Sequence, residues 1–262
     1  MKKNLTKIII TIISLVSLIT LSQKITTQTA KAATTADPVF FVVGSYSDST
    51  TWDKMYQRLD PTNSHPIVKL YVAENGAVTR TNVRTTNNNK RPFVTVSFQD
   101  ILWNDQAVYT NAACLQNAIE TYRAKDPFNS ADIVAHSNGG NVVTRYMETD
   151  DSVNFHNFIS IGTPYNMRAE NTQPATDMLL SLVAGASRLN HSMNVINVIG
   201  SAISDNSTDT VVSRDSAMAG DHIFYGNVAS FSRLYLTGND AVHPNQASSA
   251  QVAQILSSHL DL

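Results

Sequence analysis

Residues 132–140 read Asp-Ile-Val-Ala-His-Ser-Asn-Gly-Gly, and this stretch decides how we interpret the whole chain. A β-rich run ends in Ala135-His136-Ser137-Asn138-Gly139, and residues compatible with a helix follow it. A serine on a strained turn between a strand and a helix forms a nucleophile elbow, which projects the hydroxyl above a sheet. Such a turn packs only with small residues two before and two after the serine. Gly139 is the usual glycine at the second of these positions. At the first, Ala135 replaces the more common glycine but is still small. Ser137 is therefore the predicted nucleophile.

The rest of the chain alternates short β-rich runs with longer amphipathic stretches. This alternation is typical of a parallel sheet flanked by helices. No internal repeat or long low-complexity linker interrupts it, so we expect one α/β domain with a mostly parallel central sheet. The expected strands are residues 38–43, 67–72, 92–98, 132–135, 158–161, 195–199 and 231–236, and the expected helices are residues 52–59, 111–125, 139–147 and 246–260.

Two stretches do not fit this alternation. Residues 82–91 are polar, and we expect a solvated loop there, shortly after a strong turn signal at Asn75-Gly76. Residues 166–190 contain the apolar segment Met178–Val183 between two expected strands. We expect an ordinary packed helix in this segment, and the alternative is a small cap insertion over the active end of the sheet.

The first residues of the chain have the features of an export signal. A basic start at residues 2–7 precedes the apolar run Ile8–Leu21, and Ala30-Lys31-Ala32 places small residues at the two positions that a signal peptidase inspects. The apolar run is shorter than the roughly 20 residues that span a bilayer. We therefore predict a signal peptide at 1–32, a mature domain at 33–262 and no transmembrane anchor after cleavage. The protein would be secreted, either released or retained at the cell wall.

Charge and cysteine content narrow the classes of partner. The mature chain of 230 residues carries 14 basic and 21 acidic residues, a net charge of −7. This acidic net charge argues against nucleic acid or an anionic membrane surface as the main partner, because both bind basic patches.

Cys114 is the single cysteine, so no internal disulfide is available, and its apolar surroundings predict a core position. No His/Cys spacing predicts a metal site, and we expect no metal or cofactor.

A serine hydroxyl needs a histidine base, and the imidazolium that forms needs an acid. In a sheet with a nucleophile elbow, these residues follow in the order Ser, acid, His. His243 fits best, because it lies on the loop Gly238–His243 between the last expected strand and the last expected helix. The other candidates fit less well, since His259 has the spacing of a buried helix residue, and His65 and His156 lie outside the required order or beside the wrong strand.

The acid has two candidates. Asp209 follows the expected strand at residues 195–199 and opens the segment Asp209–Ser213, in which Val211 and Val212 would anchor a loop. Asp205 is its nearest alternative. We prefer Asp209, although either carboxylate could instead serve a surface turn or a helix cap.

Acyl transfer also needs donors for the oxyanion. The N–H of Asn138, directly after the nucleophile, is one expected donor. The second should come from the loop Gly44-Ser45-Tyr46 after the first expected strand, and we choose Ser45. A flexible Gly/Ser surface loop is the alternative for this segment.

Taken together, these residues resemble the α/β-hydrolase superfamily, and more narrowly the lipase- or esterase-like secreted serine hydrolases of Gram-positive bacteria. The elbow is similar to that of small bacterial lipases, which share Ala-His-Ser-x-Gly-Gly. The resemblance implies Ser137 as nucleophile, Asp209 as acid, His243 as base, and Ser45 with Asn138 as oxyanion donors. It rests on Pro38–Gly44, Trp52 and Met55, Ala135–Gly140, Gly162–Asn166, Asp209–Ser213, Ser216-Ala217 and His243.

Two residues depart from the pattern of these hydrolases. Val43 replaces the histidine that usually precedes the glycine of the oxyanion loop, and Ser213 replaces a frequent proline after the acid. Neither change removes a member of the predicted triad, so we expect an enzyme that hydrolyses carboxylic esters through an acyl-enzyme.

The expected substrate is a small-molecule or lipid acyl ester. The alternatives are a catalytically silent secreted binding protein with the same fold, and an acyltransferase or peptidase with the same triad. The sequence leaves the oligomeric state open.

Overall fold

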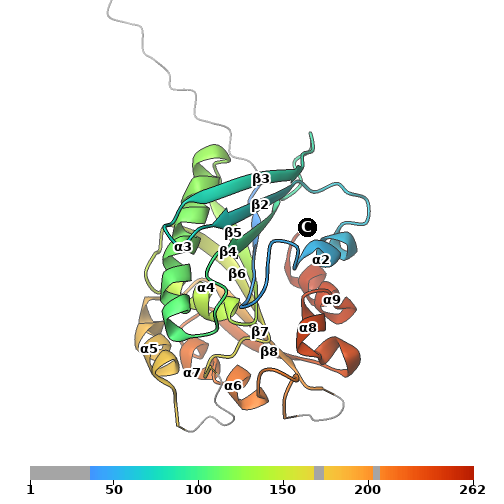
Figure 1. The fold of residues 1–262 in the computed structure, drawn as a ribbon. Coiled ribbons are helices and arrows are strands. Elements are labelled where there is room, and N and C mark those ends of the chain that lie inside the picture. Colours follow the sequence, from blue (N-terminus) through green and yellow to red (C-terminus); the bar gives the residue numbers. More distant parts are fainter. Residues whose placement is uncertain (1–35, 168–173, 203–206) are drawn as a thin grey trace, which may run out of the picture. The chain divides into compact units, whose positions relative to one another are not determined.

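The computed structural model describes residues 36–167, 174–202 and 207–262 (Figure 1). The predicted signal peptide, its cleavage site and Asp205 lie outside these residues. Within the described ranges, none of the helices combines the length and the apolar character needed to cross a membrane.

The fold is built on an eight-stranded sheet with the strand order β3-β2-β4-β1-β5-β6-β7-β8. Every neighbouring pair is parallel except β2 and β3, which are antiparallel. The prediction of a mostly parallel α/β sheet in one domain is therefore confirmed. The strands are β1 (Val39–Val42), β2 (Ile67–Val72), β3 (Val78–Arg84), β4 (Phe93–Phe98), β5 (Ser130–His136), β6 (Asn154–Ile161), β7 (Asn194–Gly200) and β8 (Ser230–Leu236).

Helices cover both faces of the sheet, with α3 and α4 on one side and α2 and α9 on the other (Figure 1). The helices are α2 (Asp53–Leu59), α3 (Asp105–Lys125), α4 (Gly139–Met147), α5 (Asp177–Gly185), α6 (Arg214–Met218), α7 (Asp221–Phe224), α8 (His243–Gln246) and α9 (Ala250–His259), with short 3-10 turns at Ala186–Arg188 and Gly238–Ala241.

Strand β1 lies near the middle of the sheet, and all four of its residues are buried. Side chains alternate along a strand, so two neighbouring phenylalanines serve opposite layers. Phe40 packs edge-on against Tyr122 of α3, whereas Phe41 contacts Trp52 and Tyr56 beside and within α2. Burial on both faces is typical of parallel sheets and explains why these strands are almost continuously apolar. The core holds the carboxyl ends of β1 and β5 in place, where the candidate site lies.

Three segments differ from the expectations. The residues expected to begin a polar loop at Asn82 instead complete β3, an exposed edge strand that reaches β2 through the turn at Asn75-Gly76. Helix α3 begins at Asp105, six residues before the expected start, because the Asn104 side chain caps it by accepting a hydrogen bond from Ala107 N. The expected terminal helix is divided into α8 and α9, and Ser249 caps the second by accepting from Val252 N.

The apolar segment Met178–Val183 belongs to α5. Met178, Leu179 and Leu182 are buried, while Leu180 and Val183 are exposed. Helix α5 packs against α4 and α7. Among the described residues, α5 contributes none to the cleft beside Ser137, so it is the packed helix that we expected.

Candidate active site

Ser137 lies between the end of β5 and the start of α4, as an elbow requires. Its φ angle is +55°, a left-handed conformation that is uncommon for residues other than glycine and is a form of backbone strain found at functional sites. Two hydrogen bonds hold the turn: Ser137 N donates to Ile161 O at 2.8 Å, and Gly140 N donates to Ser137 O at 3.0 Å. The strand-turn-helix geometry predicted from residues 132–140 is present.

Glycines allow the neighbouring backbone to approach this turn closely. A Cβ added to Gly44 would lie 2.6 Å from Ser137 Cβ, and one added to Gly139 would lie 2.5 Å from Val43 O. Both distances are far below normal van der Waals contact. The loop after β1 and the elbow after β5 can therefore meet only because these two positions lack side chains.

The three residues predicted as nucleophile, base and acid form one chain of hydrogen bonds. His243 Nε2 lies 3.0 Å from Ser137 Oγ, and His243 Nδ1 lies 2.6 Å from Asp209 Oδ2. His243 N also donates to Asp209 O at 2.8 Å, so backbone and side chain together hold the histidine beside the acid. All three residues are buried or nearly so. A hydroxyl in this setting can pass its proton to a neutral imidazole, whose positive charge the carboxylate then offsets.

Hydrogen bonds keep Asp209 ionised despite its burial. Burial acts to raise the pKa of this carboxyl, but hydrogen bonds from His243 and from the N–H groups of Val212 and Val211 outweigh it and leave the pKa below its ordinary value. Gln246 adds a further donor, since its Nε2 lies 2.9 Å from Asp209 Oδ2. The carboxylate is thus charged at neutral pH, as an acid that stabilises an imidazolium must be.

Gln246 is a contact of the candidate acid that was not predicted from the sequence. Its side chain is fully buried, and Nε2 also donates to Ala241 O at 3.0 Å, so the amide is fixed between the acid and the turn before His243. Its spacing could have indicated this contact. Gln246 follows His243 by three residues, and residues three apart lie on the same face of a helix.

We expect Gln246→Leu to lower kcat about tenfold with little change in KM. Loss of the donor leaves Asp209 less firmly oriented, and a hydrogen bond to a charged group contributes about 1.5–3 kcal/mol. The measurement is kcat on a 4-nitrophenyl ester, normalised to the number of active serines titrated with a phosphonate. Gln116→Leu, on the exposed face of α3, is the control, and an unchanged normalised kcat in Gln246→Leu would exclude this positioning role.

His136 packs directly against the predicted base. The ring centroids of His136 and His243 are 4.7 Å apart, and His136 Nε2 donates to His243 O at 3.2 Å. Burial and the neighbouring His243 lower the pKa of His136 from 6.5 to about 3. The ring therefore stays neutral at physiological pH and supports His243 without adding positive charge.

This depressed pKa predicts a loss of stability in acid. The unfolded chain protonates His136 near pH 6.5, whereas the folded protein does so only near pH 3. Stability is therefore complete above pH 6.5 and falls as the pH drops toward 3, at about 1.4 kcal/mol per unit for this residue. Between pH 7 and pH 4.5, wild type should lose about 2–3 kcal/mol more unfolding free energy than His136→Gln, measured with urea. Equal losses in the two proteins would contradict the low pKa.

The two predicted oxyanion donors lie on facing segments. Asn138 Nδ2 donates to Ser45 Oγ at 3.2 Å, and Ser45 Oγ donates to Leu102 O at 2.9 Å, which ties the loop after β1 to the elbow. In the part of the chain that the structure describes, neither Ser45 N nor Asn138 N donates a hydrogen bond to another protein group. Both N–H groups could therefore donate to an oxyanion, which stays a prediction for Ser45 and Asn138.

The other histidines lie apart from this chain of hydrogen bonds. His65 is buried and stacks on Phe93, with its Nδ1 2.8 Å from Arg91 O. His156 is exposed on β6. His259, which the helical spacing predicts to be buried, is exposed at the end of α9, and that prediction is wrong. Cys114 lies in the core, as predicted.

A cleft of about 500 Å³ opens beside Ser137 and His243. The loop after β1, the start of α2 and helix α8 line it. No group of three or more His, Cys, Asp or Glu side chains among residues 36–167, 174–202 and 207–262 could hold a metal ion.

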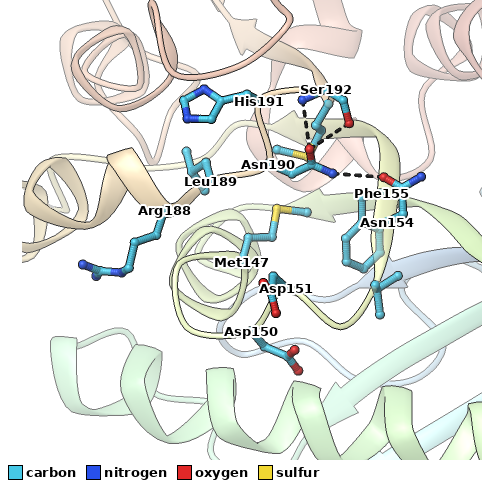
Figure 2. A pocket seen from close by; sticks show the side chains of 12 residues that line it. Met147, Asp150, Asp151, Asn154, Phe155, Arg188, Leu189, Asn190, His191 and Ser192 are labelled. Carbon is cyan, nitrogen blue, oxygen red and sulfur yellow. Dashed lines mark hydrogen bonds between the residues drawn. The ribbon is translucent and has the colours of Figure 1, made fainter.

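A second cavity of about 560 Å³ lies where β6 and β7 begin, whereas the triad lies where parallel strands end (Figure 2). Asn190 is fixed there by hydrogen bonds with Asn154 and Ser192. Acidic and basic side chains line the cavity with apolar ones, and its lining includes none of the predicted catalytic residues.

Comparison with solved structures finds two close matches in fold. A gene product of Listeria innocua has a TM-score of 0.77 and 22% identity, covering 86% of this chain and 94% of that one. A protein of Lactobacillus plantarum WCFS1 described as a "putative cell surface hydrolase" has a TM-score of 0.76 and 24% identity, covering 87% and 92%. A lipase-esterase related protein of Clostridium acetobutylicum matches at a TM-score of 0.52 and 11% identity, covering 86% and 95%.

These likenesses establish the fold. A comparison with curated protein sequences finds no match. The family is established by sequence, because the model of the family described as "Alpha/beta hydrolase of unknown function (DUF915)" matches residues 26–261, nearly the whole chain. The protein therefore belongs to this family of α/β hydrolases.

Proposed function

We propose that the protein is a secreted serine hydrolase that cleaves carboxylic esters through Ser137, His243 and Asp209. One observation carries the proposal: the unbroken hydrogen-bonded chain from Ser137 Oγ through both ring nitrogens of His243 to a buried, ionised Asp209. Such a chain activates a hydroxyl that is otherwise a poor nucleophile at neutral pH.

The reaction would proceed in two halves. His243 Nε2 takes the proton of Ser137 as Oγ attacks the ester carbonyl, and the resulting oxyanion is held by the N–H groups of Ser45 and Asn138. The bond to the alcohol then breaks, and His243 gives its proton to the departing alkoxide. Next, His243 takes a proton from water as that water attacks the acyl-serine. Collapse of this second intermediate releases the carboxylic acid and returns the proton to Ser137.

Further observations support esters as the substrate class and secretion as the location. The lipase-esterase related protein of Clostridium acetobutylicum has the same fold, and the ester class is the one that the sequence resemblance implies. The N-terminal residues have the pattern of an export signal, and the match from Lactobacillus plantarum is described as a cell surface protein. These observations favour an exported esterase over an intracellular peptidase.

Reaction with a fluorophosphonate tests the proposal. The protein, expressed from Ala33 onward, should be labelled. The label should be lost in Ser137→Ala and strongly reduced in His243→Ala, because the phosphonate reacts only with an activated serine. No labelling of folded wild type would favour the silent binding protein. Labelling with faster acyl transfer to an added alcohol than to water would identify an acyltransferase.

A further inference from the structure

Polar side chains dominate the cleft beside Ser137. Apart from Ser137, His136 and His243, its described lining includes an exposed tyrosine, a carboxylate, an ammonium group and five hydroxyls, with Pro244 and Ala247 as the aliphatic contributions. Small-molecule pockets are usually lined predominantly by apolar and aromatic side chains, so this cleft is unusually polar and a poor fit for a hydrocarbon chain. The polar members are Ser45, Tyr46, Ser47, Asp48, Thr50, Thr51, Lys54 and Ser248.

The hydroxyls of this cleft are arranged to accept hydrogen bonds. Thr50 Oγ1 donates to Asp48 Oδ1 at 2.6 Å, and Thr51 Oγ1 donates to Asp48 O at 2.8 Å. Ser45 Oγ likewise donates to Leu102 O. Each hydroxyl has one hydrogen, so these three oxygens offer a ligand only lone pairs, and on Ser45 one lone pair already accepts from Asn138 Nδ2. A complementary ligand therefore carries hydrogen-bond donors, such as hydroxyl groups.

Asp48 strengthens this preference for donors. Thr50 N and Thr50 Oγ1 both donate to its Oδ1, and these hydrogen bonds hold the pKa of Asp48 below its ordinary value, so the group is a carboxylate. Lys54, the second residue of α2, adds an ammonium donor to the same cleft. A hydrocarbon chain placed here would cover these groups without returning hydrogen bonds, which is unfavourable.

Tyr46 gives the cleft an apolar surface among the polar groups. Its φ angle of +55° is rare for so large a residue, and its N–H donates to Ile101 O at 2.9 Å, so the strained position is held. The residue is 63% exposed. A tyrosine presents an apolar ring face next to a polar tip. A saturated ring with C–H groups on its faces and hydroxyls on its rim is complementary to both features.

Resting on the proposed function, we propose that the natural substrate is an acyl ester of a carbohydrate-type alcohol. The sugar ring lies over Tyr46, and its free hydroxyls are bound by Asp48, Thr50 and Lys54 while Ser137 attacks the acyl carbonyl. The bond that breaks joins the acyl carbon to the sugar oxygen, and water supplies the hydroxyl of the released acid.

Two acetate esters, one of a sugar ring and one of an all-carbon ring, test this substrate class. Methyl 6-O-acetyl-glucopyranoside and cyclohexylmethyl acetate present the same acetyl group on a six-membered ring. We expect kcat/KM to be at least about tenfold higher for the sugar ester, since tenfold corresponds to the gain or loss of about 1.4 kcal/mol in the transition state. In Tyr46→Asn, whose asparagine tolerates a positive φ, this ratio should fall toward one. Tyr225→Asn is the control, because Tyr225 is 81% exposed and lies outside the cleft.

The outcomes separate this inference from the proposed function. A ratio that favours the sugar ester and falls in Tyr46→Asn but not in Tyr225→Asn supports it. Equal rates, faster hydrolysis of the cyclohexyl ester, or hydrolysis of neither ester by a protein that fluorophosphonate labels at Ser137 would overturn the substrate class and leave the activated serine standing. Failure of both labelling and hydrolysis would overturn the proposed function and this inference with it.

Discussion

Ser137→Ala should lower kcat for ester hydrolysis by about 10⁴- to 10⁶-fold while the protein remains folded. The substitution removes the one oxygen that attacks the carbonyl, and His243 then has no hydroxyl to deprotonate. Loss of a triad nucleophile costs about this much, with residual activity left to the oxyanion donors and substrate binding. The measurement is kcat on 4-nitrophenyl acetate, with circular dichroism to verify folding.

The matched control for this prediction is Ser192→Ala. Ser192 is exposed at the opposite end of the strands, beside the cavity in Figure 2, where its hydroxyl bonds to Asn190. Its removal should leave kcat unchanged. Retention of more than about one tenth of the wild-type kcat in Ser137→Ala would show that another group performs the attack.

Asp209→Asn should lower kcat by about 10⁴-fold with KM changed little. Asparagine keeps the size of the side chain, but it removes the negative charge that offsets the imidazolium and favours the wrong tautomer of His243. The effect is large because Asp209 Oδ2 makes the 2.6 Å contact with His243 Nδ1 inside the protein, where water does not replace the lost charge. Steady-state kinetics on the same ester measures it.

Two further substitutions sharpen this test. Asp151→Asn, on the exposed lining of the second cavity, should have no effect on kcat. Asp205→Asn tests the other carboxylate that, from the sequence, could be the acid of the triad. A loss of 10⁴-fold in Asp205→Asn with normal activity in Asp209→Asn would move the acid role to Asp205 and contradict the assignment.

The central part of the fold was predictable because its strands and helices have strong patterns. The expected bounds of Ile67–Val72 and Gly139–Met147 match the structure, since the first is a compact β-branched run and the second follows a glycine pair with a clear apolar face. The edge strand β3 was missed because most of its side chains are exposed and polar. This segment is a strand because it forms hydrogen bonds with β2. Such pairing cannot be predicted from the local sequence pattern alone.

The predicted site residues lie together, but the sequence contained only part of their surroundings. Chain order and loop position were enough to predict that Ser137, Asp209 and His243 lie together, because carboxyl ends of parallel strands share one edge of a sheet. The contact of Gln246 with Asp209 and that of His136 with His243 depend on tertiary packing between elements far apart in the chain. The polar lining of the cleft also depends on how the loop after β1 folds back.

Detection of the acyl-enzyme tests the central claim most directly. The protein is mixed with 4-nitrophenyl acetate, quenched in acid during turnover, digested and analysed by peptide mass spectrometry. We predict a rapid release of 4-nitrophenolate and an acetyl group on the peptide that contains Ser137, both absent from Ser137→Ala. Steady hydrolysis with the acetyl group on another residue, or with none on Ser137 at any quench time, would contradict it.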